Sequence, residues 1–365
     1  TAQERKLFNK VLEKGSRIIE RWPQEIEYKP EILFLMGESF WNMGNWGQAI
    51  TKYDEYEKYF PEHANQKTAQ YHRAHSLVKL GQNPLARFAL KEILADPKHP
   101  YRLEALNLLA TIESNSLAPE KAIAALQELL SMPEGSQFLK AKAHYQLAEI
   151  YFEMENWAQA RQNYLSPYLK ELNQRKQFHS RLQSILCLQN NQKFLLAIKE
   201  LNALVLEKKY RSKKNQLNML LAQLQWNAFN HTIAEEIFLD LAIENPKTLL
   251  SAEAWYHIAG IREELRRLEK ALVAYQNVSK QQPYSNWAKK AKPKIKDLEK
   301  LLKLQTARDK EGLSDLDEFK LAELFLFKLN EVDTALNILD SLSKQTIDTL
   351  VQMQSTYAKA FIYET

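Results

Sequence analysis

The stretch Glu31–Pro61, EILFLMGESFWNMGNWGQAITKYDEYEKYFP, decides the fold. Its first half places apolar or small residues at the three- and four-residue intervals of one helix face, namely Leu33, Met36, Gly37 and Phe40. Glycines then interrupt the pattern, and a second apolar face begins at Ala49. Pro61 ends this second face, because proline cannot continue a helix. The stretch therefore predicts two helices joined by a tight turn.

The alanine of the second helix recurs along most of the chain, at Ala49, Ala86, Ala122, Ala160, Ala197, Ala234 and Ala271. The successive differences are 37, 36, 38, 37, 37 and 37 residues. Four residues after each alanine lies a large apolar or aromatic residue. Twelve residues before it lies a small residue in every unit except one, which has Ile185. A fixed period of this size is typical of helical repeats. We predict an all-α, right-handed superhelical solenoid of antiparallel helix pairs with a period of about 37 residues.

The period breaks between Ala271 and Ala335, which are 64 residues apart. An apolar helical stripe from Trp287 to Leu302 predicts a single-helix repeat, and the charged sequence after it predicts a loop near Asp309–Ser314. We therefore divide the chain into three parts. They are an array over 1–283 (the second helix of an earlier repeat, then seven helix pairs), an irregular helix and loop over 284–314 that can form a bend, and a further repeat with an unpaired first helix over 315–365.

The unpaired helix is expected at Ile347–Tyr363. An amphipathic helix without a partner exposes its apolar face, so we predict that the natural protein continues or docks there.

Composition limits the classes of partner. The 50 basic and 45 acidic residues are dispersed and give a net charge of +5, so we expect no nucleic-acid partner. No run approaches the ~18 apolar residues of a membrane-spanning helix. Two basic runs, Lys208–Lys214 and Lys289–Lys296, fit an anionic partner or lipid headgroups, and they equally fit a solvated loop and a solvated helix face.

Catalytic signatures are missing from the sequence, which holds no phosphate-binding loop, nucleophile elbow or paired-cysteine metal site. His72 and His75 have the spacing of two metal ligands on a helix, but no third ligand is suggested, and we expect ordinary surface histidines. Cys187 lies on an apolar stripe and is expected to be a buried thiol. We therefore expect no enzymatic activity, no metal and no cofactor.

Aromatic residues mark a candidate binding surface. In a solenoid of this kind the first helices line the concave groove, and fixed positions around the small residue point into it. Aromatic anchors beside polar groups suit a protein-binding groove. The alternative is that the same rings pack between adjacent repeats. The predicted groove residues are Phe34, Glu38, Trp41, Tyr71, His75, Tyr145, Glu149, Phe152, Met219, Gln223, Trp226 and Tyr256.

The period and segments such as AHYQLAEIYFEMENWAQARQNY (143–164) resemble tetratricopeptide repeats. The longer unit and the opening FNKVLEKGSRIIERWP (8–23) with the stretch 31–61 are similar to the BamD-like lipoproteins, which lie on the periplasmic face of the bacterial outer membrane. The segment FKLAELFLFKLNEVDTALNILDSL (319–342) resembles repeats in envelope lipoproteins of the Bacteroidetes–Chlorobi–Fibrobacter type. The lipid-bearing cysteine of the BamD-like family has no counterpart here.

These resemblances imply a non-enzymatic scaffold for bacterial envelope assembly, which binds a partner protein or peptide in the concave groove. They imply a periplasmic location at the outer membrane, with peripheral or lipid-anchored association left open. Two alternatives are a cytoplasmic regulatory or co-chaperone module, and a platform within a longer protein that has a catalytic domain elsewhere.

Overall fold

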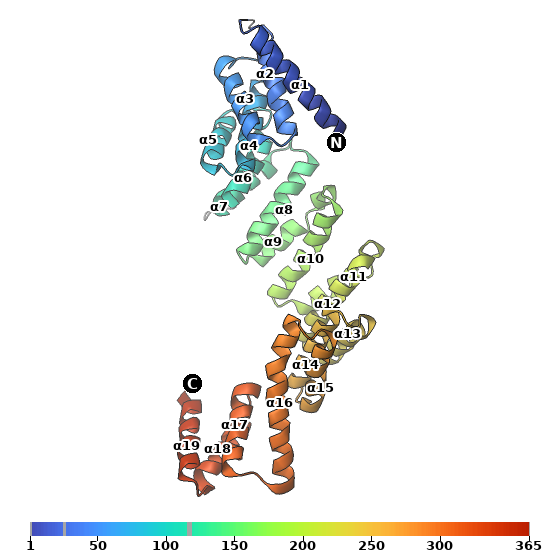
Figure 1. Ribbon diagram of the computed structural model, residues 1–365, viewed down its shortest axis with the longest axis vertical. Helices are drawn as coiled ribbons and strands as arrows, with labels where there is room; N and C mark the ends of the chain where they lie inside the picture. The colour runs from blue at the N-terminus through green and yellow to red at the C-terminus, as the bar shows by residue number, and fades with distance from the viewer. Residues whose placement is uncertain (1, 25–26, 115–118, 365) are drawn as a thin grey trace. The chain divides into compact units, whose positions relative to one another are not determined.

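The computed structural model describes residues 2–24, 27–114 and 119–364, and every regular element in these ranges is a helix (Figure 1). The chain divides into two compact units, Thr1–Gln192 and Lys193–Thr365. Each unit is described by itself below. The division lies inside the repeat in which Ile185 replaces the small residue.

The first unit holds α1 (Ala2–Arg21), α2 (Lys29–Asn42), α3 (Trp46–Tyr59), α4 (Gln66–Lys79), α5 (Asn83–Ala95), α6 (Arg102–Ser114), α7 (Pro119–Ser131), α8 (Gln137–Glu153), α9 (Trp157–Tyr164), the short 3-10 helix η1 (Pro167–Glu171) and α10 (Gln174–Asn190). Four helix pairs, from α2–α3 to α8–α9, follow one another along the chain. The first helices α2, α4, α6 and α8 also contact one another in that order, so they form a shared face of the unit.

The second unit holds α11 (Phe194–Val205), the 3-10 helix η2 (Lys208–Lys213), α12 (Lys214–Asn227), α13 (His231–Glu244), α14 (Leu249–Glu264), α15 (Leu268–Gln281), α16 (Asn286–Glu311), α17 (Asp315–Leu329), α18 (Val332–Gln345) and α19 (Thr349–Glu364). Its helix pairs are α12–α13, α14–α15 and α17–α18. The two units together confirm an all-α solenoid of consecutive helix pairs.

The periodic alanines explain why the helices pair so closely. All seven, and Ala335 after the break, have no exposed surface. The small residue twelve positions earlier is equally restricted, because a Cβ atom added at Gly37 would lie 2.7 Å from the ring of Tyr53. The repeat pattern is therefore a steric requirement at the crossing of two helices.

The turn within each helix pair repeats the same period in its backbone. A residue with positive φ, between 56° and 77°, occurs at Gly44, Gly81, Glu155, Gln192, Phe229 and Arg266. These positions are multiples of 37 residues apart, and the remaining position of the series, residue 118, lies outside the described ranges. The residue after the turn donates its N–H back to the first helix, as from Asn45 to the Phe40 carbonyl at 2.9 Å. Five of these six turns, those at Gly44, Gly81, Glu155, Phe229 and Arg266, thus end the first helix with the same hydrogen bond.

The break in the period is a single long helix. As expected, α16 has no partner helix of its own repeat. The helix continues through Glu311, so the loop predicted at Asp309–Ser314 is shorter and comprises only residues 312–314. Gly312 ends the helix with a φ of 76°. Ser314 then caps α17 by accepting a hydrogen bond from the Asp317 N–H at 3.3 Å.

The last helix, α19, buries Val351 and Ser355 but leaves Met353 and Tyr357 more than 70% exposed, as its sequence pattern predicts. None of the helices within 2–24, 27–114 and 119–364 is both long enough and apolar enough to cross a membrane.

Candidate functional site

Trp41 contacts two histidines of the first helix of the next repeat. Its ring stacks on His72 of the next first helix, with centroids 4.2 Å apart and an interplanar angle of 14°. Its indole N–H donates to Nδ1 of His75 at 3.1 Å. Burial, followed by the charges of Lys79, His72 and Lys142, lowers the pKa of His75 to about 4. His75 is therefore neutral near pH 7 and can accept this hydrogen bond.

Glu38 lies at the same junction between repeats. Its carboxylate accepts a hydrogen bond from the hydroxyl of Tyr53 at 2.6 Å and pairs with Nδ1 of His72. Burial and the hydrogen bond to Glu38 raise the pKa of Tyr53 far above its usual value. His72 is only 9% exposed, so the expectation of surface histidines is wrong, because Trp41 of the preceding repeat covers them. The described residues include no cluster of His, Cys, Asp and Glu suited to a metal ion.

The other aromatic residues of the first unit also contact neighbouring repeats. Tyr71 stacks on Tyr101 with centroids 4.6 Å apart, and its pKa is raised to about 12 by burial and by Glu104. The hydroxyl of Tyr145 lies 3.0 Å from Nδ1 of His179 on α10.

Three further predicted residues contact side chains of their own repeat, and Glu149 also lies 3.7 Å from Nδ1 of His179 on α10. Glu149 accepts a hydrogen bond from Tyr164. Phe34 packs on Tyr56, and Phe152 meets Trp157 edge to face at 5.1 Å.

In the second unit the predicted residues are more dispersed. Met219 is buried in the core formed by α12 to α16, and Gln223 is half-buried. The indole N–H of Trp226 donates to Oε2 of Glu264 at 2.7 Å. Tyr256 packs on Trp287 with centroids 5.1 Å apart.

All twelve predicted groove residues are half-buried or buried. The contacts of Trp41, Tyr71, Tyr145 and Tyr256 fit the alternative reading of rings that pack between repeats. Whether the groove binds a partner stays a prediction.

Three lysines that the sequence analysis did not single out join these rings in the first unit. Burial lowers the pKa of Lys142, the nearby charges of Lys176 and Lys79 lower it further, and Glu104 raises it. Three ammonium groups, from α8, α10 and α4, therefore lie near one another. The ammonium of Lys176 lies 4.8 Å from the ring centre of Tyr145, and that of Lys142 lies 4.5 Å from the ring centre of Phe138. None of the three makes an ion pair with a described residue.

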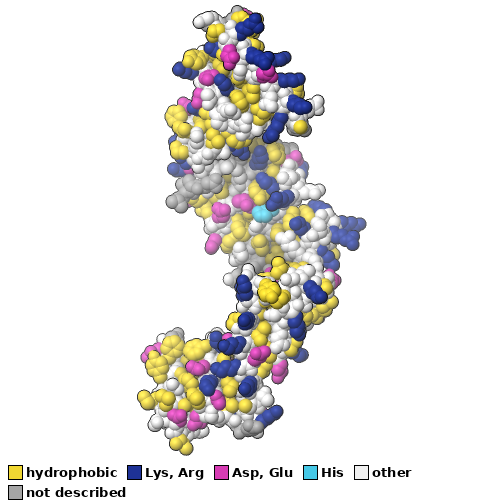
Figure 2. Space-filling view, in the orientation of Figure 1, with side chains coloured by type: hydrophobic (Ala, Val, Ile, Leu, Met, Phe, Trp, Pro, Cys, Tyr) yellow, Lys and Arg dark blue, Asp and Glu magenta, His cyan; other side chains and the backbone are white. Residues whose placement is uncertain are grey.

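We call this surface the basic aromatic face. It comprises Tyr71, His75, Lys79, Phe138, Lys142, Tyr145 and Lys176. Over the side of the molecule shown in Figure 2, in contrast, basic, acidic and hydrophobic side chains are interspersed.

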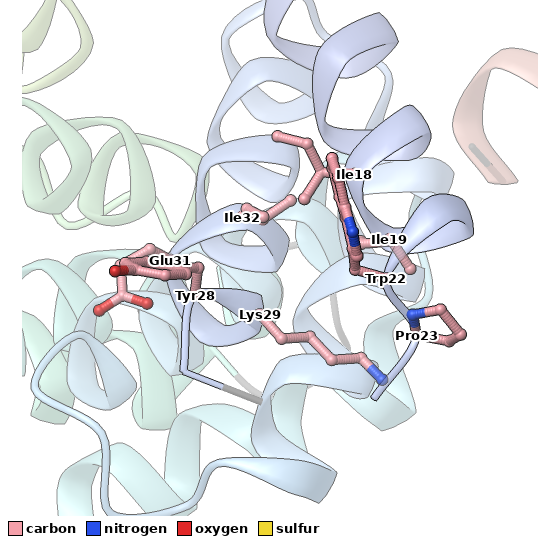
Figure 3. Close-up of a pocket in the computed structure, with 8 residues that line it drawn as sticks. All are labelled: Ile18, Ile19, Trp22, Pro23, Tyr28, Lys29, Glu31 and Ile32. Carbon is pink, nitrogen blue, oxygen red and sulfur yellow. The ribbon is translucent and has the colours of Figure 1, made fainter. Parts of the chain in front are cut away.

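A pocket of about 500 Å³ lies between the end of α1 and the start of α2 (Figure 3). Ile18 and Trp22 point from the α1 side toward Ile32 on α2, and the Lys29 side chain extends along the edge. Trp22 is 48% exposed, so the pocket is open to a large apolar group. The sequence pattern did not predict this pocket, because its volume depends on the angle between α1 and α2.

Cys187 is 1% exposed, which confirms the prediction of a buried thiol. Burial raises its pKa to about 11, so the reactive thiolate is scarce near pH 7.

We compared the chain with models of known protein families. A model described as tetratricopeptide repeat matches residues 31–63, which hold most of α2 and all of α3, and residues 142–166, which hold most of α8 and all of α9. The two matched stretches are tetratricopeptide repeats. Repeats of this family form scaffolds for protein–protein interaction and are typically non-catalytic. A search of curated proteins found no match.

Solved structures with similar folds have low sequence identity. A tetratricopeptide repeat protein from Parabacteroides merdae is 16% identical, with a TM-score of 0.44 over 73% of this chain and 97% of that one. The C-terminal part of a repeat protein from Cytophaga hutchinsonii is 13% identical, with a TM-score of 0.43 over 79% and 98%. The structure of Naa15/Naa10 bound to HypK-THB matches at 15% identity and a TM-score of 0.48, over 92% of this chain and 55% of that one. These likenesses carry no argument about function.

Proposed function

We propose that the repeats form a non-enzymatic scaffold whose basic aromatic face binds a segment of a partner protein. The observation that carries the proposal is the set of three neighbouring ammonium groups, Lys79, Lys142 and Lys176, which make no ion pair with a described residue. Two of them, Lys142 and Lys176, lie over aromatic rings. Their mutual repulsion and the partial burial of Lys142 cost free energy in the unbound protein. A partner that supplies carboxylates there removes this cost.

The rings beside the lysines supply the apolar part of such an interface. Tyr145 and Phe138 already carry ammonium groups on their faces, and Phe138 is 49% exposed. Aromatic side chains held by contacts lose little conformational freedom on binding and commonly act as anchors. The expected partner segment therefore combines acidic residues with apolar ones.

A site-specific crosslinker tests this assignment. p-Benzoylphenylalanine replaces Tyr145 on the basic aromatic face in one variant and Phe88, which is 64% exposed on α5, in a control. We expect a discrete crosslinked partner from position 145 and none of that mass from position 88. Lys142→Glu with Lys176→Glu should remove the adduct, whereas Lys121→Glu on α7 should not. Equal adducts from both positions, or adducts indifferent to Lys142→Glu with Lys176→Glu, would contradict the proposal.

The resemblance of residues 8–61 to BamD-like lipoproteins supports a role in bacterial envelope assembly, in the periplasm at the outer membrane. Fractionation of cells that carry the native gene tests this location. Recovery of the protein with the outer membrane or periplasm supports it, and recovery in the cytoplasm contradicts it. The three lysines favour the alternative of a cytoplasmic regulatory or co-chaperone module, in which a basic groove would bind the carboxylates of a peptide.

A further inference from the structure

The solvent side of α16 carries six lysines in one row: Lys289, Lys292, Lys296, Lys300, Lys303 and Lys310. All six are exposed. The basic run noted in the sequence, Lys289–Lys296, supplies three of them. The row continues over the rest of a helix that stands out by its length in Figure 1.

Helix geometry places these lysines on one side. At 3.6 residues per turn the six positions fall within an arc of about 80° and span about 32 Å along the axis. The opposite side of α16 is buried in the unit through Ala291, Leu298 and Leu301. The row therefore lies on the crest of the helix, where a flat surface can meet every ammonium group.

None of the six makes an ion pair with a described residue. Two neighbouring carboxylates have other partners, since Asp297 pairs with Lys328 at 3.2 Å and Glu263 with Lys294 at 2.6 Å. A third, the exposed Glu299, lies beside the row and accepts a hydrogen bond from Gln276 at 3.4 Å. The charge of Lys300 is a minor cause of the lowered pKa of Asp317 on α17. The ion pair of Asp317 is with Lys320 at 2.9 Å.

The row lowers the stability of the helix that carries it. Like charges at i, i+3 and i, i+4 repel each other along a helix surface. Lys292, Lys296 and Lys300 form two consecutive i, i+4 pairs of this kind. An anionic surface that meets all of them would relieve this repulsion.

We propose that this lysine row docks the protein electrostatically on the surface of an anionic lipid membrane. Two observations favour a membrane over a nucleic acid. The row contains lysine and no arginine, and the only arginine of α16, Arg308, is engaged with Glu318 at 2.9 Å. Arginine is the residue that recognises individual phosphates by paired hydrogen bonds, whereas lysine acts as a point charge toward a diffuse surface.

The second observation is the absence of stacking partners along the row. Protein surfaces that bind single-stranded nucleic acid interleave aromatic rings with basic groups. The nearest aromatic residue of α16 is Trp287, which is half-buried and already lies 4.7 Å from the ammonium of Lys290. Lys303 and Lys310 also border a shallow hollow with Leu302, Thr306 and Ala307. A row of exposed ammonium groups without aromatic rings fits a plane of headgroups. This docking is independent of the proposed function, because the row belongs to the second unit.

Vesicle co-sedimentation of the full chain tests the proposal, with phosphatidylcholine vesicles alone and with added phosphatidylglycerol. We expect binding to the anionic vesicles only, with a strong decrease from about 50 to about 500 mM salt as the charges are screened. Each lysine at an anionic surface contributes roughly fivefold in affinity. Replacement of Lys292, Lys296, Lys300 and Lys303 by Gln should therefore weaken the vesicle affinity by more than about tenfold.

A matched control removes the same charge elsewhere. Lys6, Lys121, Lys199 and Lys280, which are exposed on other helices, are replaced by Gln together. This variant should keep most of the affinity, and circular dichroism should show unchanged helicity for both variants. Equal weakening in the two variants would reduce the effect to net charge and overturn the proposal. Binding of the wild-type chain to duplex DNA in preference to anionic vesicles would also overturn it.

Discussion

Trp41 and Trp226 occupy the same position of two repeats, four residues after the small residue of the first helix, yet they are held differently. Trp41 stacks on the buried ring of His72 and donates to the neutral imidazole of His75. Trp226 donates to Glu264, whose side chain is 54% exposed. At this repeat position the tryptophan N–H can therefore donate its hydrogen bond either to the imidazole of a neighbouring repeat or to a solvent-exposed carboxylate. The two positions should differ in stability and in response to pH.

The largest expected difference comes from truncating the two rings. Trp41→Ala should lower the free energy of unfolding of its unit by about 3 kcal/mol, since it removes a buried stack and leaves His75 without its donor. Trp226→Ala should cost about 2 kcal/mol, because Glu264 regains water. Hydrogen exchange of the amides in α4 and α14 measures the two losses separately. Unchanged exchange with weakened partner binding would make these rings binding anchors instead.

Alanine substitutions at Gly37 and Gly260 should give a smaller difference in the free energy of unfolding. A Cβ at Gly37 would lie 2.7 Å from the fully buried ring of Tyr53, so Gly37→Ala should cost about 2 kcal/mol. A Cβ at Gly260 would lie 2.8 Å from the tip of Trp226, which is half-buried and can shift. Gly260→Ala should cost less than about 1 kcal/mol, because alanine also favours the helix. Thermal unfolding midpoints of the two variants measure the difference.

Gly47→Ala is the control for these two changes, since no heavy atom lies within 4 Å of its added Cβ. It should leave the midpoint unchanged or raise it. A loss in this variant as large as in Gly37→Ala would show that steric crowding is not the cause.

The smallest expected difference is in pH dependence. The folded state holds the pKa of His75 near 4, below its ordinary value of 6.5. Its contribution to stability is therefore complete above pH 6.5 and is lost as the pH falls toward 4. His75→Gln should flatten the decline in unfolding temperature of the first unit over this range by an amount equivalent to about 1 kcal/mol.

Glu57 opposes this effect within the same unit. Burial raises its pKa from 4.5 to about 7, so its contribution is complete below pH 4.5 and is lost as the pH rises to 7. Glu57→Gln should therefore steepen the decline toward low pH that His75→Gln flattens. If the two variants shift the pH profile in the same direction, the assignment of His75 is wrong.

The helices and their crossings were predictable because they depend on local sequence. Ala49 and its equivalents must be small wherever two helices cross, and that restriction recurs every 37 residues or so. The basic aromatic face was not predictable in this way. Lys79, Lys142 and Lys176 come from three different repeats, and only the packing of successive repeats from α4 to α10 in one unit brings their charges together.

The burial of the two histidines was not predictable from the sequence either. His72 and His75 have the spacing of exposed helix positions, but Trp41 of the preceding repeat covers them. A pattern within one helix does not report a side chain that arrives from the next repeat.

The repeated turn within each helix pair also suggests how the array can be made more heat-resistant. Gly44 and Gly81 meet its left-handed conformation without steric cost, whereas Glu155, Gln192, Phe229 and Arg266 adopt the same conformation with a side chain. Each of these four residues costs about 1 kcal/mol relative to glycine, in part offset by the greater freedom of glycine in the unfolded chain. Glycine at Glu155 and Phe229 should raise the melting temperature while leaving both the basic aromatic face and the lysine row unaltered, whereas Arg266 must stay because it pairs with Glu331 at 3.0 Å. In a protein stabilised in this way, the surface variants could be compared for binding without a contribution from partly unfolded molecules.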